Sequence, residues 1–352
     1  MSTPPPFSCT YSSGFAAVLH QLNLSLALST YQAGKVILIS PNDVQSIIQL
    51  PRSFGKAMGL ALRADQMAIA TLDEVILLRN SPDLARHYPK KPGVYDALYL
   101  PRATFFTGPL DIHDLEWGHD GLYAVNTSFS CICRIDDQYN FTPVWQPPFI
   151  SKIAAEDRCH LNGMAMHSGR PAYVTAFGTG DTPRSWRPAV TTNGVVMDVG
   201  TGQIISRDLA MPHSPRLYPE GLFVLLSARG TLLQIEPASG AQTEIFQYPG
   251  FLRGLDRYGD YLFIGVSRIR PTSKTFSQID DRFKAAPAGI LVVHLPTGQL
   301  VGQLSYQTSV EEIYDIKVLP GLRRPNIMST NTEEHKLGLA TPTATYWAVP
   351  KT

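Results

Sequence analysis

The sequence contains few cysteines, and none is placed as disulfide or zinc chemistry would require. Only four occur in 352 residues, at Cys9, Cys131, Cys133 and Cys159. Such a small and clustered set does not make a disulfide framework, and reduced thiols are typical of a cytoplasmic protein. Cys131 and Cys133 are separated by one residue, as on one face of a strand, and lack the two-residue spacing of a zinc-binding pair. We therefore expect unpaired thiols and a cytoplasmic location.

Long apolar runs and excess charge are also missing. No uninterrupted run of about 18 apolar residues occurs, so we expect no membrane span. Residues 1–14 lack the basic start and apolar core of a secretory signal. The formal net charge is +1, which gives no bulk attraction to nucleic acid or to a membrane surface. We expect neither as a partner.

The chain does contain a repeated unit rich in turns. Glycine (27) and proline (28) are abundant, as in proteins with many tight turns. Each unit has a polar entry, a pivot residue, a short apolar strand, a turn, and a second strand that ends in a small polar residue. Units of this size with four strands are typical of propeller blades, so we predict an all-β, six-bladed β-propeller. The pivots, about fifty residues apart, are Gly59, Asp114, Gly163, Arg216, Gly254 and Asp315.

The two ends of the chain are expected to close the ring. We predict a short helix over residues 13–28 and a hairpin over residues 35–50 that has no blade of its own. The sixth unit is incomplete, with strands expected at 314–319 and 326–329. The hairpin would complete this last blade and leave no sheet edge unpaired at the seam. The predicted organisation is an extension (1–34), the propeller (35–330) and a C-terminal tail packed on it (331–352); two β-sandwich domains are the alternative.

Polar side chains at the strand starts should converge on the central channel. Residues one and three positions before each pivot face the same way in an extended segment. The inner positions are Met58, His113, Asn162, Pro215, Arg253 and Tyr314. The outer positions are Lys56, Asp111, His160, His213, Phe251 and Glu312.

These residue types allow either catalysis or a structural role. His113, His160 and His213 come from three units and are candidate ligands of a divalent metal such as Zn, Fe, Mn or Ca. Tyr314 or Glu312 is then a candidate base, and Arg253 a group that steadies an oxyanion. Alternatively, each histidine caps a strand end or bonds a neighbouring carbonyl.

Arginine is the second signal. Guanidinium groups match carboxylate and phosphate, so several arginines on one face suggest an anionic ligand. The alternative is that they form salt bridges at the rim. Long insertions at residues 178–193, around Trp186, and at 268–287 either cover the site as a lid or pack on the rim. The arginines are Arg184, Arg187, Arg216, Arg229, Arg253, Arg268 and Arg270.

Several segments resemble those of a bacterial family of propeller-like proteins of unknown function, over nearly all of residues 30–330. They are 161–165, 175–178, 211–216, 253–255, 263–267, 311–315 and 319–321. The resemblance implies a cytosolic six-bladed propeller. The chain also resembles, more loosely, the gluconolactonase and regucalcin type, in which a divalent metal is bound by Glu, Asn and Asp. That resemblance makes Asn162 and Asp315 possible ligands, although Met58 and Gly59 stand where the first-blade acid is expected.

Two functions follow as hypotheses. The first is an enzyme, a lyase, isomerase or hydrolase, acting on a small anionic molecule with or without a metal. Its expected catalytic residues are His113, His160, Tyr314, Arg253 and Glu312. Its expected ligand-binding residues are Asn162, Arg216, Asp114, Asp315, Arg229, Arg268 and Trp186. The second is a non-catalytic propeller that binds a protein or peptide across the same face through aromatics such as Phe129 and Trp186. A homo-oligomer is compatible with both.

Overall fold

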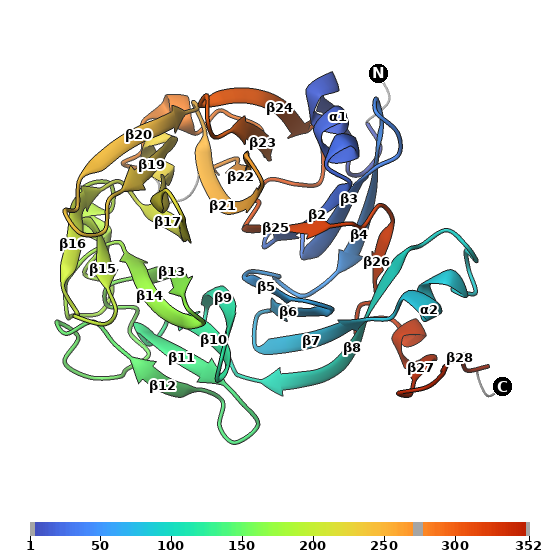
Figure 1. The fold of residues 1–352 in the computed structure, drawn as a ribbon. Coiled ribbons are helices and arrows are strands. Elements are labelled where there is room, and N and C mark those ends of the chain that lie inside the picture. Colours follow the sequence, from blue (N-terminus) through green and yellow to red (C-terminus); the bar gives the residue numbers. More distant parts are fainter. Residues whose placement is uncertain (1–3, 270–276, 350–352) are drawn as a thin grey trace.

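Six small sheets stand around a common axis, each with its innermost strand at the centre (Figure 1). The computed structural model describes residues 4–269 and 277–349. The predicted six-bladed β-propeller is confirmed, and so is its closure by the N-terminal hairpin. All four cysteines are unpaired thiols, and burial raises the pKa of Cys131 and of Cys159 to about 12.

Five blades are built from consecutive antiparallel strands. The first contains β5 (Leu60–Arg63), β6 (Gln66–Ala70), β7 (Glu74–Asn80) and β8 (Ala97–Phe106). The second contains β9 (Ile112–Gly118), β10 (Gly121–Asn126), β11 (Cys131–Ile135) and β12 (Thr142–Trp145). The third contains β13 (Leu161–His167), β14 (Arg170–Ala176), β15 (Gly194–Asp198) and β16 (Ile204–Leu209). The fourth contains β17 (Pro212–Tyr218), β18 (Gly221–Leu226), β19 (Thr231–Ile235) and β20 (Gln242–Gln247). The fifth contains β21 (Phe251–Tyr258), β22 (Tyr261–Ser267), β23 (Gly289–His294) and β24 (Gln299–Tyr306).

The sixth blade combines the two ends of the chain. Its inner strand β25 (Asp315–Pro320) pairs with β2 (Leu24–Thr30), which is followed by β3 (Lys35–Pro41) and β4 (Ile47–Ser53). The helix predicted over residues 13–28 is therefore too long: α1 (Ser13–Gln21) ends early and β2 follows. All seven residues of β2 are buried, since the sheet has apolar clusters on both sides. The propeller thus includes β2, which the sequence had placed in the extension.

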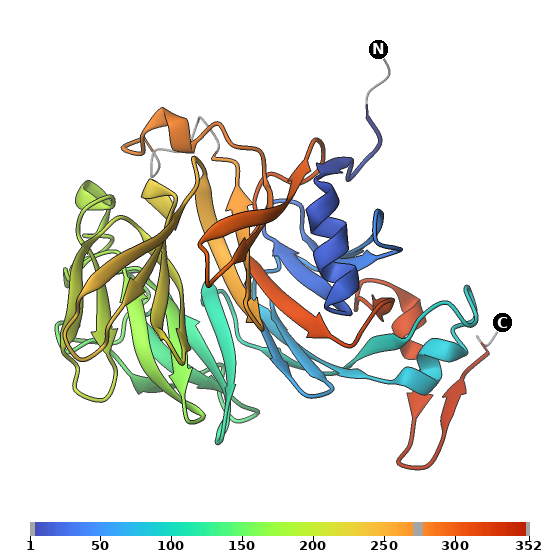
Figure 2. The same ribbon diagram turned by 45° about the horizontal axis from the view of Figure 1, so that its top comes forward.

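Short strands from the ends of the chain extend the neighbouring blades. β1 (Cys9–Tyr11) pairs with β24 on the outside of the fifth blade. The strand expected at residues 326–329 does not join the sixth blade: β26 (Pro325–Ile327) runs parallel to β8 on the first blade. The tail forms a hairpin of β27 (Gly338–Ala340) and β28 (Thr345–Trp347), which projects from the body of the molecule (Figure 2, red).

Short helices occur in the connections. α2 (Pro82–Arg86) lies beside the tail, where the Trp347 indole Nε1 donates to the Leu84 carbonyl over 3.1 Å. α1 packs against β24 (Figure 2). The 3-10 turns are Arg187–Ala189, Ser227–Arg229, Asp281–Phe283 and Glu333–Lys336. No helix in the described residues is both long and apolar enough to cross a bilayer.

Neighbouring blades are joined by apolar packing and by a repeated hydroxyl bond. Between the first two blades, for example, Ala61 and Val75 pack with Leu115 and Leu122. At the end of a second strand, a buried Ser or Thr donates to the carbonyl at the inner entry of the next blade. These bonds are Thr127 to Leu161, Ser227 to Leu252, Ser267 to Ile313 and, from the closing blade to the first, Ser29 to Met58.

Candidate functional site

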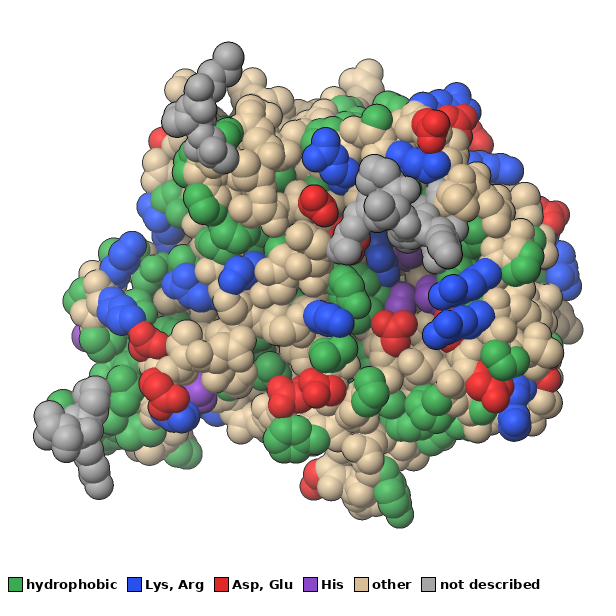
Figure 3. All heavy atoms as spheres, turned by 180° about the vertical axis from the view of Figure 1, so that it is seen from behind, with side chains coloured by type: hydrophobic (Ala, Val, Ile, Leu, Met, Phe, Trp, Pro, Cys, Tyr) green, Lys and Arg blue, Asp and Glu red, His purple; other side chains and the backbone are tan. Residues whose placement is uncertain are grey.

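A pocket of about 360 Å³ opens where the inner strands of the blades begin. It is hollowed into the face shown in Figure 3, where histidine side chains lie beside basic ones. Most of the residues predicted to converge line it: Met58, Asp111, His113, His160, His213, Phe251, Arg253, Glu312 and Tyr314. Among the other predicted residues, Lys56 and Pro215 lie outside the lining, and Asn162 lines a smaller adjoining cavity.

Two of the pocket histidines are held in the same tautomer by the backbone. The Nδ1 of His113 lies 2.9 Å from the Asp111 carbonyl, and that of His213 lies 3.0 Å from the Met211 carbonyl. Because a carbonyl only accepts, each Nδ1 carries the proton and Nε2 is left as an acceptor. Burial lowers the pKa of His113 to about 4 and the pKa of His213 well below its ordinary value. Both rings are therefore neutral near pH 7.

His160 is placed differently, because a carboxylate holds it. Its Nδ1 donates to Asp157 Oδ1 over 3.0 Å, and its ring packs against Phe177 and Trp186 in tilted contacts, with centroid distances of 4.5 and 4.3 Å. The Trp186 indole donates to the other oxygen of Asp157 over 3.1 Å. An imidazole oriented by a carboxylate is a good proton acceptor, as in catalytic triads. Of the three histidines, this one is best suited to act as a base.

Tyr314 and Arg253 form the opposite part of the lining. The Arg253 guanidinium lies 3.5 Å from the centre of the Tyr314 ring, a close cation–π contact. Burial raises the pKa of Tyr314 well above its ordinary value, although Arg253 opposes the rise. The hydroxyl therefore keeps its proton near neutral pH and can donate a hydrogen bond, which does not favour the predicted role as a base. Glu312, the other predicted base, lines the pocket.

The arginines of the sequence fall into separate groups. Arg184, Arg187 and Arg253 line the pocket, and within the described residues none of them has a carboxylate partner. Arg229 and Arg268 are exposed and do not line the pocket. Their assignment as ligand-binding residues stays a prediction. Arg270, and with it part of the insertion considered as a lid, lies outside the described residues.

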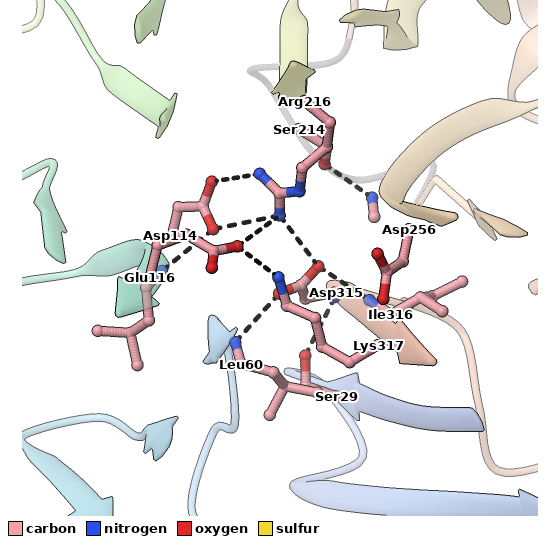
Figure 4. Close-up of polar contacts among 12 residues, drawn as sticks. Ser29, Leu60, Asp114, Glu116, Ser214, Arg216, Asp256, Asp315, Ile316 and Lys317 are labelled. Atoms are coloured by element: carbon pink, nitrogen blue, oxygen red, sulfur yellow. Dashed lines mark hydrogen bonds and ion pairs between the residues drawn. The ribbon is translucent and has the colours of Figure 1, made fainter. Parts of the chain in front are cut away.

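Arg216 lies in the interior of the channel, where it is surrounded by acids (Figure 4). It bonds both oxygens of Asp114, over 2.9 and 3.3 Å, and lies 3.7 Å from Asp315. Lys317 bonds Glu116 beside it over 2.6 Å. The side-chain contacts that the structure gives Arg216, Asp114 and Asp315 are to one another, to Glu116 and to the protein backbone. Their assignment as ligand contacts stays a prediction.

Two interior acids also join inner strands of different blades. Asp114 Oδ2 accepts from the Met164 N–H over 3.0 Å. Asp315 Oδ2 accepts from the Leu60 N–H over 3.1 Å (Figure 4). Burial raises the pKa of Asp315 to about 6, although Lys317 and Arg216 oppose the rise. These carboxylates therefore stabilise the ring.

The predicted metal centre is not assembled. His113, His160 and His213 share the pocket, but the part of the chain that the structure describes contains no group of three or more His, Cys, Asp or Glu side chains arranged to hold a metal. Each Nδ1 is bonded to a protein oxygen, so Nε2 is the ring atom that would have to coordinate a metal.

Sequence reasoning missed several residues of the site. Asp157 lies in the loop before β13, and its place three residues before His160 was the available signal. Phe177 follows β14 and stacks on His160. Trp186, which was predicted as a ligand-binding residue, lines the pocket; it is only 4% exposed, unlike the exposed aromatic that the protein-binding hypothesis required. Phe129 packs on Phe141 with ring centroids 4.8 Å apart.

Comparisons with known proteins agree with the fold. A family model described as "Domain of unknown function (DUF4915)" matches residues 13–328. No match to a curated protein was found. A chain of a nidogen/laminin complex superimposes with a TM-score of 0.54 at 12% identity, covering 85% of this chain and 99% of that one. A protein of unknown function from Bacteroides caccae gives 0.52 at 11% identity, covering 84% and 99%. These identities show the fold alone, and a likeness to gluconolactonase is not shown.

Proposed function

We propose that the pocket binds a small anionic molecule and transfers a proton to or from it. The chain belongs to the family described as a domain of unknown function (DUF4915). The observation that carries the proposal is the combination of the Asp157–His160 pair with three arginines that have no carboxylate partner among the described residues. An enzyme of the lyase, isomerase or hydrolase type is the function that this combination supports best.

The charges in the lining limit what the ligand can be. Arg184, Arg187 and Arg253 bring three positive charges, and Asp111, Asp157 and Glu312 bring three negative ones. Asp157 is already bonded to His160 and Trp186. This balance favours a ligand with one anionic group at the arginines and an uncharged part elsewhere. Guanidinium forks suit a carboxylate or phosphate for that group.

The proton acceptor in this proposal is Nε2 of His160. Asp157 fixes the proton on Nδ1 and stabilises the imidazolium that forms when Nε2 takes a second proton. His113 and His213 are neutral and can only orient the ligand through hydrogen bonds, because burial lowers the pKa of both. The expected catalytic residues thus act in different ways: His160 as the base, Arg253 on the anion, and Tyr314 as a donor.

The second hypothesis, a propeller that binds a protein across this face, required exposed aromatic side chains. Trp186 and Phe129, on which it relied, are packed against other rings. No observation therefore favours it over the first. Cytoplasmic location and a homo-oligomeric state stay predictions.

The proposal can be tested with a panel of small anions. Inorganic phosphate, acetate, oxalate and pyruvate are titrated against the protein by calorimetry, and hydrogen exchange at carbon is followed by NMR in D₂O. We expect at least one anion to bind, and Arg253→Gln to weaken it by about tenfold, as for the loss of one charged hydrogen bond. Arg229→Gln is the control, since Arg229 is an exposed arginine outside the pocket.

His160→Gln should leave anion binding within about threefold and abolish exchange, because the glutamine amide does not accept the proton. If no anion of the panel binds, or if Arg229→Gln and Arg253→Gln behave alike, the proposed function is wrong.

A further inference from the structure

A second, much smaller cavity adjoins the pocket inside the channel. Its volume is about 10 Å³, which is close to the space needed for one oxygen-sized group or one water. Four residues line both spaces: His113, His213, Arg253 and Tyr314. A ligand in the pocket therefore lies next to the entrance of this cavity.

Three hydrogen-bond donors around the cavity have no acceptor within the described residues. They are Nδ2 of Asn162, the hydroxyl of Tyr314 and Nε of Arg216. The three residues are 3%, 6% and 8% exposed, so water outside the protein does not satisfy them. Buried donors left without an acceptor are unfavourable, and they are rare unless something binds there.

The acids that also line the cavity do not supply the missing acceptor. Both oxygens of Asp114 accept bonds from Arg216 and from backbone N–H groups. Both oxygens of Asp315 accept backbone N–H groups as well, from Ile316 and Leu60. These two carboxylates therefore leave the three donors without an acceptor.

We propose that this cavity is an oxyanion hole, in which Tyr314 and Asn162 donate to the substrate oxygen that becomes negative when His160 removes a proton. The inference rests on the proposed function and names its substrate class: an anion with a C–H bond next to a carbonyl. Donors that are fixed before the reaction stabilise developing charge without reorganisation.

The step balances without any further reactant. Nε2 of His160 takes the proton from the carbon next to the carbonyl, and the electron pair of that C–H bond forms a C=C bond. The π pair of the carbonyl moves to its oxygen, which lies in the cavity as an enolate oxygen. Return of a proton to the same carbon restores the carbonyl and gives hydrogen exchange, or epimerisation where that carbon is a stereocentre, with no net oxidation.

Oxalate is a suitable probe, because it is planar and resembles the enolate of a 2-oxo acid, with one carboxylate for the arginines and one oxygen for the cavity. Its affinity is measured by calorimetry for the wild type, for Tyr314→Phe and for Tyr218→Phe. The first variant removes only the hydroxyl and keeps the ring under Arg253. Tyr218 also has a buried hydroxyl without a partner in the described residues, but it lines neither the pocket nor the small cavity, so its variant is the matched control.

We expect Tyr314→Phe to weaken oxalate binding at least tenfold and Tyr218→Phe to change it less than twofold, with both variants unfolding close to the wild-type temperature. Equal binding by wild type and Tyr314→Phe overturns the oxyanion hole, and the cavity then holds only a water. Binding of inorganic phosphate without binding of oxalate also overturns it, while the anion pocket stands. If no anion of the panel binds, the proposed function itself has failed.

Discussion

The imidazole of His113 is enclosed by the pocket lining, with its side chain 7% exposed. Burial lowers its pKa from 6.5 to about 4, and His160 and Arg253 act in the same direction while Asp111 opposes them. The lowered pKa applies to the folded protein, whereas in the unfolded chain the histidine is protonated at its ordinary pKa. Its contribution to stability is complete above the unfolded pKa and is lost as the pH falls from about 6.5 through 4.

We therefore predict that the free energy of unfolding of the wild type falls between pH 7 and pH 4 by on the order of 3 kcal/mol more than that of His113→Gln. Asp315 acts in the opposite direction, since its pKa is raised to about 6, but it is present in both proteins. Urea titrations across this range measure the difference. His87→Gln, at an exposed histidine, should follow the wild type; parallel curves for His113→Gln and wild type would contradict the prediction.

Single residues of the site were predictable where the backbone alone decides their direction. The repeat was enough to bring His113, His160, Arg253 and Tyr314 to one pocket, although the backbone of His160 is left-handed (φ 52°) and not extended as assumed. It was not enough to predict which polar groups satisfy each other. Arg216 was expected to meet a ligand, but it meets Asp114, which comes from a strand 102 residues away in sequence.

At the scale of elements, α1 is held against β24 by two glycines. A Cβ added to Gly14 would lie 2.1 Å from the Val301 carbonyl oxygen, and one added to Gly302 would lie 2.9 Å from Cα of Phe15. This close approach lets Phe15 and Leu19 reach the core, where both are fully buried. The contact also explains why a helix of nine residues is stable here, since isolated helices of this length are marginal.

Gly14→Ala should therefore destabilise the protein by about 1–3 kcal/mol, because the added methyl pushes α1 away from β24. The higher helix propensity of alanine, worth up to about 1 kcal/mol, opposes this loss. Equilibrium unfolding in urea measures the change. Gly55→Ala is the control, since a Cβ there meets nothing within 4 Å and should change stability by less than about 0.5 kcal/mol. A neutral or stabilising effect at Gly14 would show that the helix is not held this closely.

The boundary between α1 and β2 shows a limit of prediction from periodicity. Leu24, Leu26 and Leu28 pack into one apolar cluster and Ala27 into another, so both faces of β2 are buried. A strand buried on both faces loses the alternation of apolar and polar residues and can be read as part of a helix. The second strand of the closing blade, β2, was not recognised for this reason, although the blade itself was predicted.

At the scale of the whole molecule, closure of the ring depends on two chain segments that are far apart in sequence. β25 and β2 pair over the register Asp315–Ser29 to Pro320–Leu24. The repeat predicted from sequence, in which each second strand ends in a small polar residue, now has a physical role at four junctions between blades. The place of β26 on the first blade was not predictable, because three residues carry too little pattern to choose a partner strand.

Ser29, at the seam between β2 and β25, and Ser267, at the junction between the fifth and sixth blades, make the same kinds of hydrogen bond. They allow the stability of the seam to be compared with that of a junction where the chain is continuous. Ser29 donates to the Met58 carbonyl and accepts from the Asp315 N–H; Ser267 donates to the Ile313 carbonyl and accepts from the Ile313 N–H. Both side chains are buried, at 0% and 5% exposure. Removing either hydroxyl leaves a buried carbonyl and a buried N–H unsatisfied, which costs about 1–3 kcal/mol for each orphaned group.

We predict that Ser29→Ala and Ser267→Ala lower the free energy of unfolding by similar amounts and that each variant still unfolds in one transition. The reason is that β2 and β25 share a full antiparallel ladder, so the seam unfolds together with the ring rather than before it. Circular dichroism and tryptophan fluorescence in urea measure this, since coincident curves indicate a single transition. An early transition found in Ser29→Ala and not in Ser267→Ala would mean that the sixth blade opens by itself. The pocket, which takes Tyr314 from that blade, would then lose one wall before the rest of the protein unfolds.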